Sequence, residues 1–159
     1  MKERDFGPIP GSTILRGVSG QKTIVMAANA RIAMVAPGIF KAAKDTDSAV
    51  FLELARSECD LKGGYTGLTP KDFSEKMREA AKAAQFDTWA LHADHITIKT
   101  GDSKEIEGTK QLIDAQINAG YTSFAIDASH LFDFEGKTVR EELEPNIRAT
   151  TELALFIKN

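Results

Sequence analysis

The sequence has little cysteine, no surplus of basic residues and no long apolar run. Cys59 is the only cysteine among 159 residues, which excludes an intramolecular disulfide and is typical of a reducing cytosol. Lys and Arg total 20 against 23 Asp and Glu, so neither nucleic acid nor an anionic membrane is an expected partner. No apolar stretch approaches the roughly 20 residues that cross a bilayer, and residues 1–5 lack the apolar core of a secretory signal. We therefore expect a globular cytoplasmic domain.

Strand-like and helix-like segments alternate along the chain. Runs of apolar, β-branched or aromatic residues predict strands at 23–28, 49–55, 88–93 and 121–126. Apolar spacings of three and four residues predict helices at 37–43, 70–84, 103–119 and 140–158. Thr69 is expected to cap the second of these helices, with Pro70 in its first turn, and Pro145 is expected to mark the real start of the last.

This order predicts a parallel sheet, which can either stay open or belong to a barrel. No G-x-G-x-x-G fingerprint follows any predicted strand, and polar residues follow all four strands. They are Asn29, then Arg56, Ser57 and Glu58, then Asp94 and His95, then Asp127, Ser129 and His130. We therefore expect the N-terminal half, about four βα units, of a (β/α)₈ TIM barrel. Residues 1–22 form a lead-in and 23–159 the four units.

The segment that ends the third predicted strand carries the sharpest chemical pattern. Strand alternation sends His92 and Asp94 to one side, while His95 starts the loop. A neutral imidazole beside a carboxylate suits a divalent metal or acid–base catalysis. Alternatively, His92 is a satisfied interior histidine, and Asp94 and His95 cap the loop.

Asp127 ends the fourth predicted strand, where a carboxylate must be paired, hydrogen-bonded or bound to metal. It could also be structural, accepting backbone N–H groups from residues 128–131. The glycine-rich loop 63–67 could hold an anion, although it lacks the end of a Walker loop. Cys59 is expected to be an unreactive thiol, Trp89 a core residue and His130 an exposed polar residue.

Several motifs resemble those of one enzyme family. The segment from Leu91 to His95 resembles the L-H-x-D-H element of class II, metal-dependent fructose- and tagatose-bisphosphate aldolases, and 123–129 resembles their S-x-M-I-D-x-S element. Residues 144–147, Glu-Pro-Asn-Ile, stand where the family commonly has E-E-N-I. The stretch 63–73 resembles the G-G-Y-T-G-x-T-P-x-D-F loop of the non-catalytic subunit of tagatose-bisphosphate aldolase. The resemblance extends over about residues 23–155.

The resemblance implies roles for four residues. Asp94 would be the catalytic acid and base, and His95 a ligand of Zn²⁺ or another divalent transition metal. Asp127 would be a second or alternative metal ligand, and Asn29 would bind substrate. The implied reaction is reversible aldol cleavage of a ketose (bis)phosphate to dihydroxyacetone phosphate and an aldehyde.

Two departures from the family pattern limit what the chain can do alone. Ala55 and Arg56 stand where many members have a serine near a substrate phosphate. The other two histidine ligands belong to the family's second half, and a catalytic zinc needs three protein ligands. We therefore expect negligible aldolase activity from these 159 residues alone. The chain is either the N-terminal half of an aldolase or a non-catalytic accessory subunit of a tagatose-bisphosphate-type aldolase. A barrel fragment with other chemistry is a third possibility.

A half-barrel would leave its first and fourth strands as unpaired edges. We therefore expect either a homo-oligomer, in which a twofold axis completes eight strands, or association with a second half-barrel.

Overall fold

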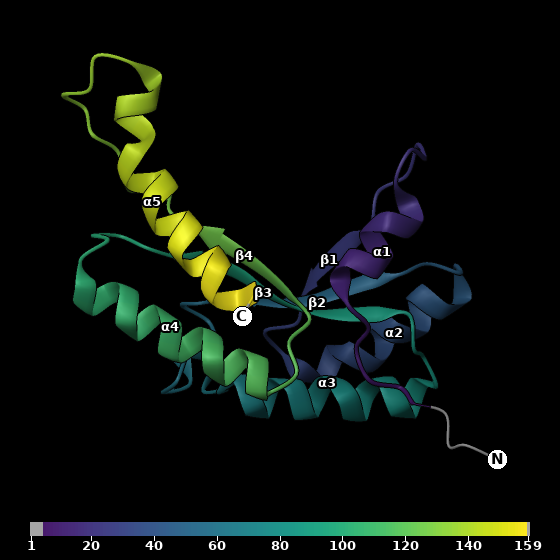
Figure 1. The fold of residues 1–159 in the computed structure, drawn as a ribbon. Helices are drawn as coiled ribbons and strands as arrows, with labels where there is room; N and C mark the ends of the chain where they lie inside the picture. The colour runs from purple at the N-terminus through teal and green to yellow at the C-terminus, as the bar shows by residue number, and fades with distance from the viewer. Residues whose placement is uncertain (1–4, 159) are drawn as a thin grey trace.

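The computed structural model describes residues 5–158, so residues 1–4 of the expected lead-in and residue 159 lie outside it. Four strands form one parallel sheet in the order β1-β2-β3-β4, and helices alternate with them (Figure 1). The elements are α1 (Gly11–Val18), β1 (Met26–Asn29), η1 (Ala33–Val35), α2 (Ala36–Asp45), β2 (Val50–Ala55), η2 (Gly64–Thr66), α3 (Pro70–Ala84), β3 (Trp89–Thr97), α4 (Ser103–Asn118), β4 (Ser123–Asp127) and α5 (Val139–Lys158). The predicted α/β class and the parallel order are confirmed. Closure into a barrel stays a prediction.

The two faces of the sheet have different cover. Helices α2, α3 and α4 lie against one face, and α1 lies on the other (Figure 1). Leu52, Leu54 and Leu91 point to the helical layer and are at most 2% exposed. On the opposite face, Ile14 of α1 packs on Phe51 and Ala90. We call this second face, which carries Phe51 and Ala90, the inner face of the sheet.

The main core lies between the sheet and the helical layer. Trp89 is fully buried there and meets the ring of Phe40 edge-on, with the ring centroids 5.2 Å apart. Its indole N–H donates to the Phe6 carbonyl oxygen at 2.9 Å, which satisfies the one polar atom that the ring would otherwise bury. The prediction that Trp89 is a core residue is confirmed.

Helix α3 begins and ends where the sequence predicts. The Thr69 hydroxyl accepts from the backbone N–H of Asp72 at 3.3 Å, and the Asp72 carboxylate accepts from the backbone N–H of Thr69 at 3.0 Å. Pro70 takes a first-turn position, where its missing N–H costs no hydrogen bond. The local cap therefore determines this boundary.

Several other boundaries differ from the predictions, and those of β1, β3 and α5 differ most. Strand β1 begins at Met26 rather than at residue 23, because pairing with β2 begins there, and Ile24, which precedes the strand, is 95% exposed. Strand β3 continues to Thr97 with a register shift between Ala93 and Ile96, so the expectation that His95 starts a loop is wrong.

Pro145 lies inside α5 rather than at its start, which is a further wrong prediction. The helix begins earlier because Thr138 caps it. The Thr138 hydroxyl accepts from the backbone N–H of Glu141 at 3.2 Å, and the Thr138 carbonyl oxygen accepts from that of Glu142. Within residues 5–158, no helix is both long and apolar enough to cross a membrane.

Candidate functional site

The polar residues predicted from strand ends do gather at one end of the sheet. Parallel pairing places Asn29 beside Glu53, and Glu53 beside His92. The next inward residue of β3, Asp94, lies opposite Ala55 at the end of β2. Alternation therefore brings Glu53, His92 and Asp94 to the inner face near the carboxyl ends of the strands.

Glu53, His92 and Asp94 are close enough to bind one ion. Each offers a donor atom, and these atoms lie within 4.8 Å of one another. All three side chains are partly buried. Burial and the nearby Asp94 carboxylate raise the pKa of Glu53 above its ordinary value. Burial lowers the pKa of His92, which favours a neutral imidazole at pH 7.

The His92 ring is held by neighbours on two sides. Its Nδ1 lies 2.9 Å from the Ser123 hydroxyl oxygen on β4. The Phe51 ring meets it edge-on at 5.8 Å. His92 is thus an ordered inner-face histidine rather than a loop residue.

His95 is presented by an irregularity of β3. Its backbone has φ +41°, and its side chain is 64% exposed. A strand irregularity of this kind redirects a side chain that regular alternation would send to the other face. The His95 Nδ1 lies 2.7 Å from Asp94 Oδ1, and this hydrogen bond raises the pKa of His95. The structure therefore brings Asp94 and His95 into contact, while their roles as acid–base and metal ligand stay predictions.

Asp127 makes local contacts at the end of β4. Its Oδ1 accepts from the backbone N–H of Ser129 at 3.0 Å, and its Oδ2 accepts from the Thr97 hydroxyl at 3.4 Å. The bonds to Ser129 and the charge of His95 lower the pKa of Asp127. These contacts are those of the structural alternative, and the metal role of Asp127 stays a prediction.

Asn29 belongs to a network around Glu58 that the sequence analysis did not identify. Glu58 is 5% exposed and accepts from Asn29 Nδ2 at 2.6 Å, from the Tyr65 hydroxyl at 2.6 Å and from the backbone N–H of Ala55 at 2.8 Å. Arg31 Nε lies 3.2 Å from the same carboxylate. Burial opposes the charge, but these hydrogen bonds prevail and lower the pKa of Glu58. The network fixes Asn29 in place, and its substrate-binding role stays a prediction.

The glycine-rich loop folds around Glu58. A Cβ on Gly64 would lie 2.5 Å from the Glu58 carbonyl carbon, and Gly64 has φ +53°, so only glycine fits there. The backbone N–H groups of Lys62 and Gly64 already donate to Asp60 Oδ1. The anion that this loop holds is therefore its own Asp60 carboxylate.

An open cleft of about 670 Å³ lies beside His95 at the carboxyl ends of β2 and β3. Its lining carries both signs of charge: Arg56, Lys99 and the exposed His130, and the carboxylates of Asp60 and Glu105. Arg56 is anchored, because its Nη1 donates to the Thr97 carbonyl oxygen at 2.7 Å and to the Thr109 hydroxyl at 3.0 Å. A cleft of this size next to the Asp94–His95 pair can admit a small molecule.

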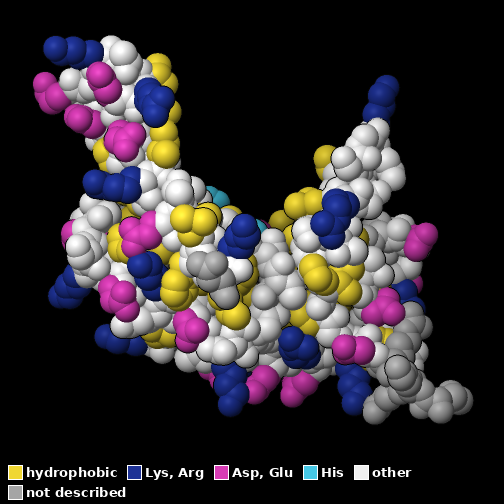
Figure 2. All heavy atoms as spheres, viewed as in Figure 1, with side chains coloured by type: hydrophobic (Ala, Val, Ile, Leu, Met, Phe, Trp, Pro, Cys, Tyr) yellow, Lys and Arg dark blue, Asp and Glu magenta, His cyan; other side chains and the backbone are white. Residues whose placement is uncertain are grey.

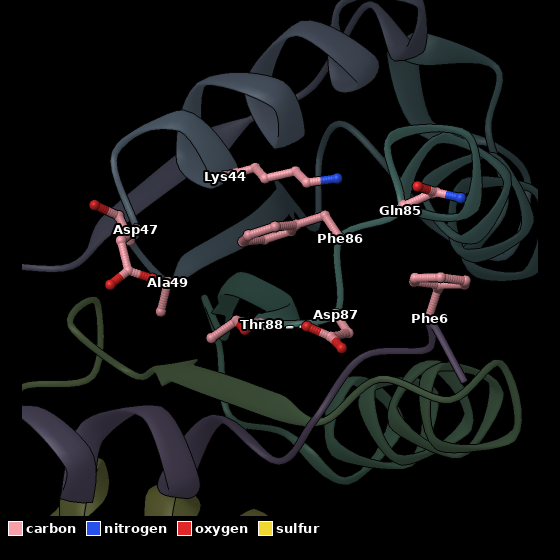
Figure 3. A pocket seen from close by; sticks show the side chains of 9 residues that line it. Phe6, Lys44, Asp47, Ala49, Gln85, Phe86, Asp87 and Thr88 are labelled. Carbon is pink, nitrogen blue, oxygen red and sulfur yellow. Dashed lines mark hydrogen bonds between the residues drawn. The ribbon is translucent and has the colours of Figure 1, made fainter. Parts of the chain in front are cut away.

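A second cleft, of about 610 Å³, lies at the opposite ends of β2 and β3 (Figure 3). Residues of the turns before these strands line it, including Lys44, Asp47 and Phe86. None of the strand-end residues predicted to be functional lies there. The cleft beside His95 is therefore the candidate functional site.

Cys59 takes no part in this site. It is 2% exposed, its Sγ lies 3.8 Å from the Tyr121 hydroxyl oxygen, and burial raises its pKa to about 11. The thiol is protonated at neutral pH, which supports the expectation that it is unreactive.

Comparison with known proteins identifies the family. Residues 13–154 match the family described as D-tagatose-1,6-bisphosphate aldolase subunit GatZ/KbaZ-like. The chain belongs to this family. The GatZ/KbaZ-like assignment confirms the resemblance to the tagatose-bisphosphate aldolase subunit and makes this a tagatose-bisphosphate aldolase-related protein.

Named relatives are distant and longer. The GatZ subunits of D-tagatose-1,6-bisphosphate aldolase from Salmonella typhimurium and Salmonella choleraesuis are each 29% identical over 91 residues. The match covers 54% of this chain and 22% of theirs. The crystal structure of a probable tagatose 6 phosphate kinase from Sinorhizobium meliloti superposes with a TM-score of 0.64 at 19% identity. That match covers 86% of this GatZ/KbaZ-like chain and 37% of the other, and at this identity it shows the fold alone.

Proposed function

We propose that this chain supplies the Asp94–His95 half of the active site of a class II, tagatose-bisphosphate-type aldolase. The observation that carries the proposal is the 2.7 Å contact between Asp94 Oδ1 and His95 Nδ1 at the carboxyl end of β3. The substrate would be a phosphorylated ketose or dihydroxyacetone phosphate, entering from the cleft beside His95.

The donor set fits a divalent metal such as Zn²⁺ at His95. Histidines that bind metals usually donate their second ring N–H to a carboxylate, and Asp94 stands in that position. Nδ1 is engaged, so Nε2 is the nitrogen left for the ion. Bound there, the metal would act as a Lewis acid on the substrate carbonyl.

Asp94 is the proposed proton carrier of the reaction. Its carboxylate is 21% exposed, so it can meet substrate while remaining partly shielded from water. It would take the proton from the hydroxyl that becomes the aldehyde and return it in the condensation direction. Asn29, fixed by Glu58, would orient substrate, and Asp127 would support an alternative metal position.

The proposed site needs a second half. His95 is one ligand where a catalytic zinc has three, so the others must come from the rest of a longer chain or from a partner. Strands β1 and β4 each pair on one side only. Apolar side chains are exposed close to both in the chain, with Ile24 95% exposed just before β1 and Phe134 89% exposed after β4.

A second half-barrel, from another copy or another subunit, would cover these edges and complete eight strands. Figure 2 shows the space that it would fill, as a hollow between α5 and the α1 side, with hydrophobic side chains along the inner side of α5.

The test compares the chain alone with the chain co-expressed with the catalytic subunit of a tagatose-bisphosphate aldolase. Cleavage of tagatose 1,6-bisphosphate is followed by coupled reduction of dihydroxyacetone phosphate, with added Zn²⁺. We expect negligible turnover by the chain alone, and turnover by the complex above that of the catalytic subunit alone, an increment that Asp94→Asn abolishes. Steady cleavage by the chain alone would show that no second half is needed.

The same experiment tests an accessory role, which the match to an aldolase subunit family favours as the second candidate. An accessory chain would raise the turnover or stability of the partner equally with Asp94 or Asn at position 94. That result would overturn the catalytic role of Asp94 and leave a structural subunit.

A further inference from the structure

We propose that Glu53, His92 and Asp94 form a second divalent-metal site, which is distinct from His95 and built entirely from this chain. We call these three residues the inner-face triad. The triad combines one imidazole with two carboxylates, a donor set that suits Zn²⁺, Mn²⁺ and related ions. The inference does not depend on aldolase chemistry, because it concerns binding by the isolated chain.

The spacing of the triad matches the needs of one ion. Zn²⁺ lies about 2.0–2.2 Å from imidazole nitrogen and carboxylate oxygen, so two ligands of one ion are at most about 4.4 Å apart. The donor atoms of the triad lie within 4.8 Å of one another. Small rotations of the partly exposed Glu53 and Asp94 side chains bring them into range. The backbone does not have to move, because two hydrogen-bonded neighbours, β2 and β3, carry all three residues.

The imidazole of His92 is oriented for binding. The Ser123 hydroxyl engages Nδ1 at 2.9 Å, and Phe51 packs against the ring. If Nδ1 donates to the hydroxyl oxygen, then Nε2 carries the free lone pair that a metal requires. The Ser123 hydroxyl thus does for His92 what a carboxylate does for many metal-bound histidines.

The charge of the triad is only partly compensated within residues 5–158, because Asp94 contacts His95 whereas Glu53 has no such contact. The Glu53 carboxylate makes no hydrogen bond or ion pair within residues 5–158. It lies close to a second carboxylate on a partly buried surface, and this repulsion is one reason for its raised pKa. A divalent cation would relieve that repulsion.

Asp94 would then join two groups. One oxygen, Oδ1, already accepts from His95. The other oxygen is available to the ion. In this arrangement His95 is a positioning residue that orients Asp94. A metal ion bound in the inner-face triad would keep the Asp94 carboxyl group ionised. Metal in the triad should therefore inhibit proton exchange by Asp94 rather than assist it.

Zinc binding by the full chain tests the proposal. Zn²⁺ is titrated in competition with a chromophoric chelator, and each variant is first checked for folding by circular dichroism. We expect one equivalent bound by the wild-type chain and at least a tenfold loss of affinity in both Glu53→Gln and His92→Gln. His95→Gln should retain affinity within about threefold. The matched controls, Glu107→Gln and His130→Gln, remove an exposed carboxylate on α4 and an exposed histidine, and should change nothing.

Two outcomes would overturn the inference. Wild-type chain that binds no zinc at millimolar concentration has no such site. Loss of binding in His95→Gln with retention in His92→Gln would assign the ion to His95, which would leave the proposed function standing. If the triad variants do not fold, NMR of the wild-type imidazoles decides instead. Zinc should shift the Nε2 resonance of His92, and a shift confined to His95 or His130 would contradict the proposal.

Discussion

At the scale of single residues, Glu58 shows how a buried charge can organise two loops. Hydrogen bonds from Asn29, Tyr65 and the backbone N–H of Ala55 converge on its carboxylate. A carboxylate buried without such donors would be neutral or would not be tolerated. Asn29 therefore depends on Glu58 for its orientation, although the two are 29 positions apart.

Glu58→Gln should destabilise the fold. The glutamine amide keeps one acceptor oxygen but turns an N–H donor toward groups that also donate, so we expect a loss of about 1.5–3 kcal/mol in the free energy of unfolding at pH 7. Since the folded pKa of Glu58 lies below the ordinary value of 4.5, its contribution is present above pH 4.5 and is lost as pH falls through the folded pKa. Urea unfolding from pH 7 to pH 3 measures this. Glu107→Gln is the control, and an equal effect of both variants at every pH would contradict the prediction.

A second prediction concerns the backbone of His95. Its φ of +41° is unfavourable for a residue with a side chain, by about 1–2 kcal/mol relative to glycine. We compare His95→Gly with His95→Ala, because both remove the imidazole and its bond to Asp94. The glycine variant should be about 1 kcal/mol more stable in urea unfolding. Equal stability, or a more stable alanine variant, would show that position 95 carries no such strain.

The sequence pattern indicates Asp94 and His95 as a functional pair, but it gives no sign of Glu53, and it shows Glu58 only as a polar residue at a strand end, without its partners. The first two form a polar pair after an apolar run, which is a local signal. Glu53 is a single carboxylate within an apolar strand, and its meeting with His92 depends on the register between β2 and β3. Glu58 acquires its partners only after β1 and the glycine loop have folded against it. Such long-range contacts leave no periodic pattern in the sequence.

At the scale of elements, boundaries were predictable where the capping residues are local. Helix α3 starts as predicted because Thr69 and Asp72 bond each other within one turn. Strand β3 was predicted too short because Asp94 and His95 look like a loop, whereas a register shift keeps them within the sheet. Strand β1 is shorter than predicted. Residues 23–25 have a strand-like composition, but backbone pairing with β2 begins only at Met26. Thr138, which starts α5 ahead of Pro145, is a local capping residue whose place in the sequence is consistent with this earlier start.

The prediction at the scale of elements concerns the Glu105 carboxylate at the start of α4. The Glu105 carboxylate accepts backbone N–H groups of Lys99, Thr100 and Gly101, and these bonds lower its pKa to about 2. Glu105→Gln should cost about 1 kcal/mol at pH 7, a small value because the site is partly exposed. Because the folded pKa is depressed, the cost should be present above pH 4.5 and fade as pH falls toward 2. Thermal unfolding at stepwise lower pH measures it. A cost that stays constant down to pH 2 would contradict the assignment.

At the scale of the whole molecule, the sheet is half of a predicted closed structure. Residues 23–158 form four parallel strands that alternate with helices, as predicted. The alternation of strand-like and helix-like periods along the chain was enough to predict the α/β class. Closure into a barrel could not be predicted in the same way, because it depends on strands that lie outside these residues. What the chain does show is a set of exposed apolar residues beside each open edge, which a monomer of this size rarely leaves uncovered.

The last prediction concerns those edges. Ile24, which is 95% exposed, directly precedes β1, and Phe134, whose ring stacks on Phe132 with centroids 6.0 Å apart, follows β4. If a second half-barrel covers both edges, a charge at either position must be desolvated against an apolar surface. Ile24→Asp and Phe134→Asp should each weaken self-association, or association with a co-expressed aldolase subunit, by at least tenfold. Unfolding should change little, because both side chains are exposed in the single chain.

Sedimentation velocity across a concentration series measures the association, with Gln111→Asp on exposed α4 as the matched control. A wild-type chain that stays monomeric at high concentration and binds no partner would remove the half-barrel assembly. Weakening by the α4 variant alone would place the contact on the helical layer instead.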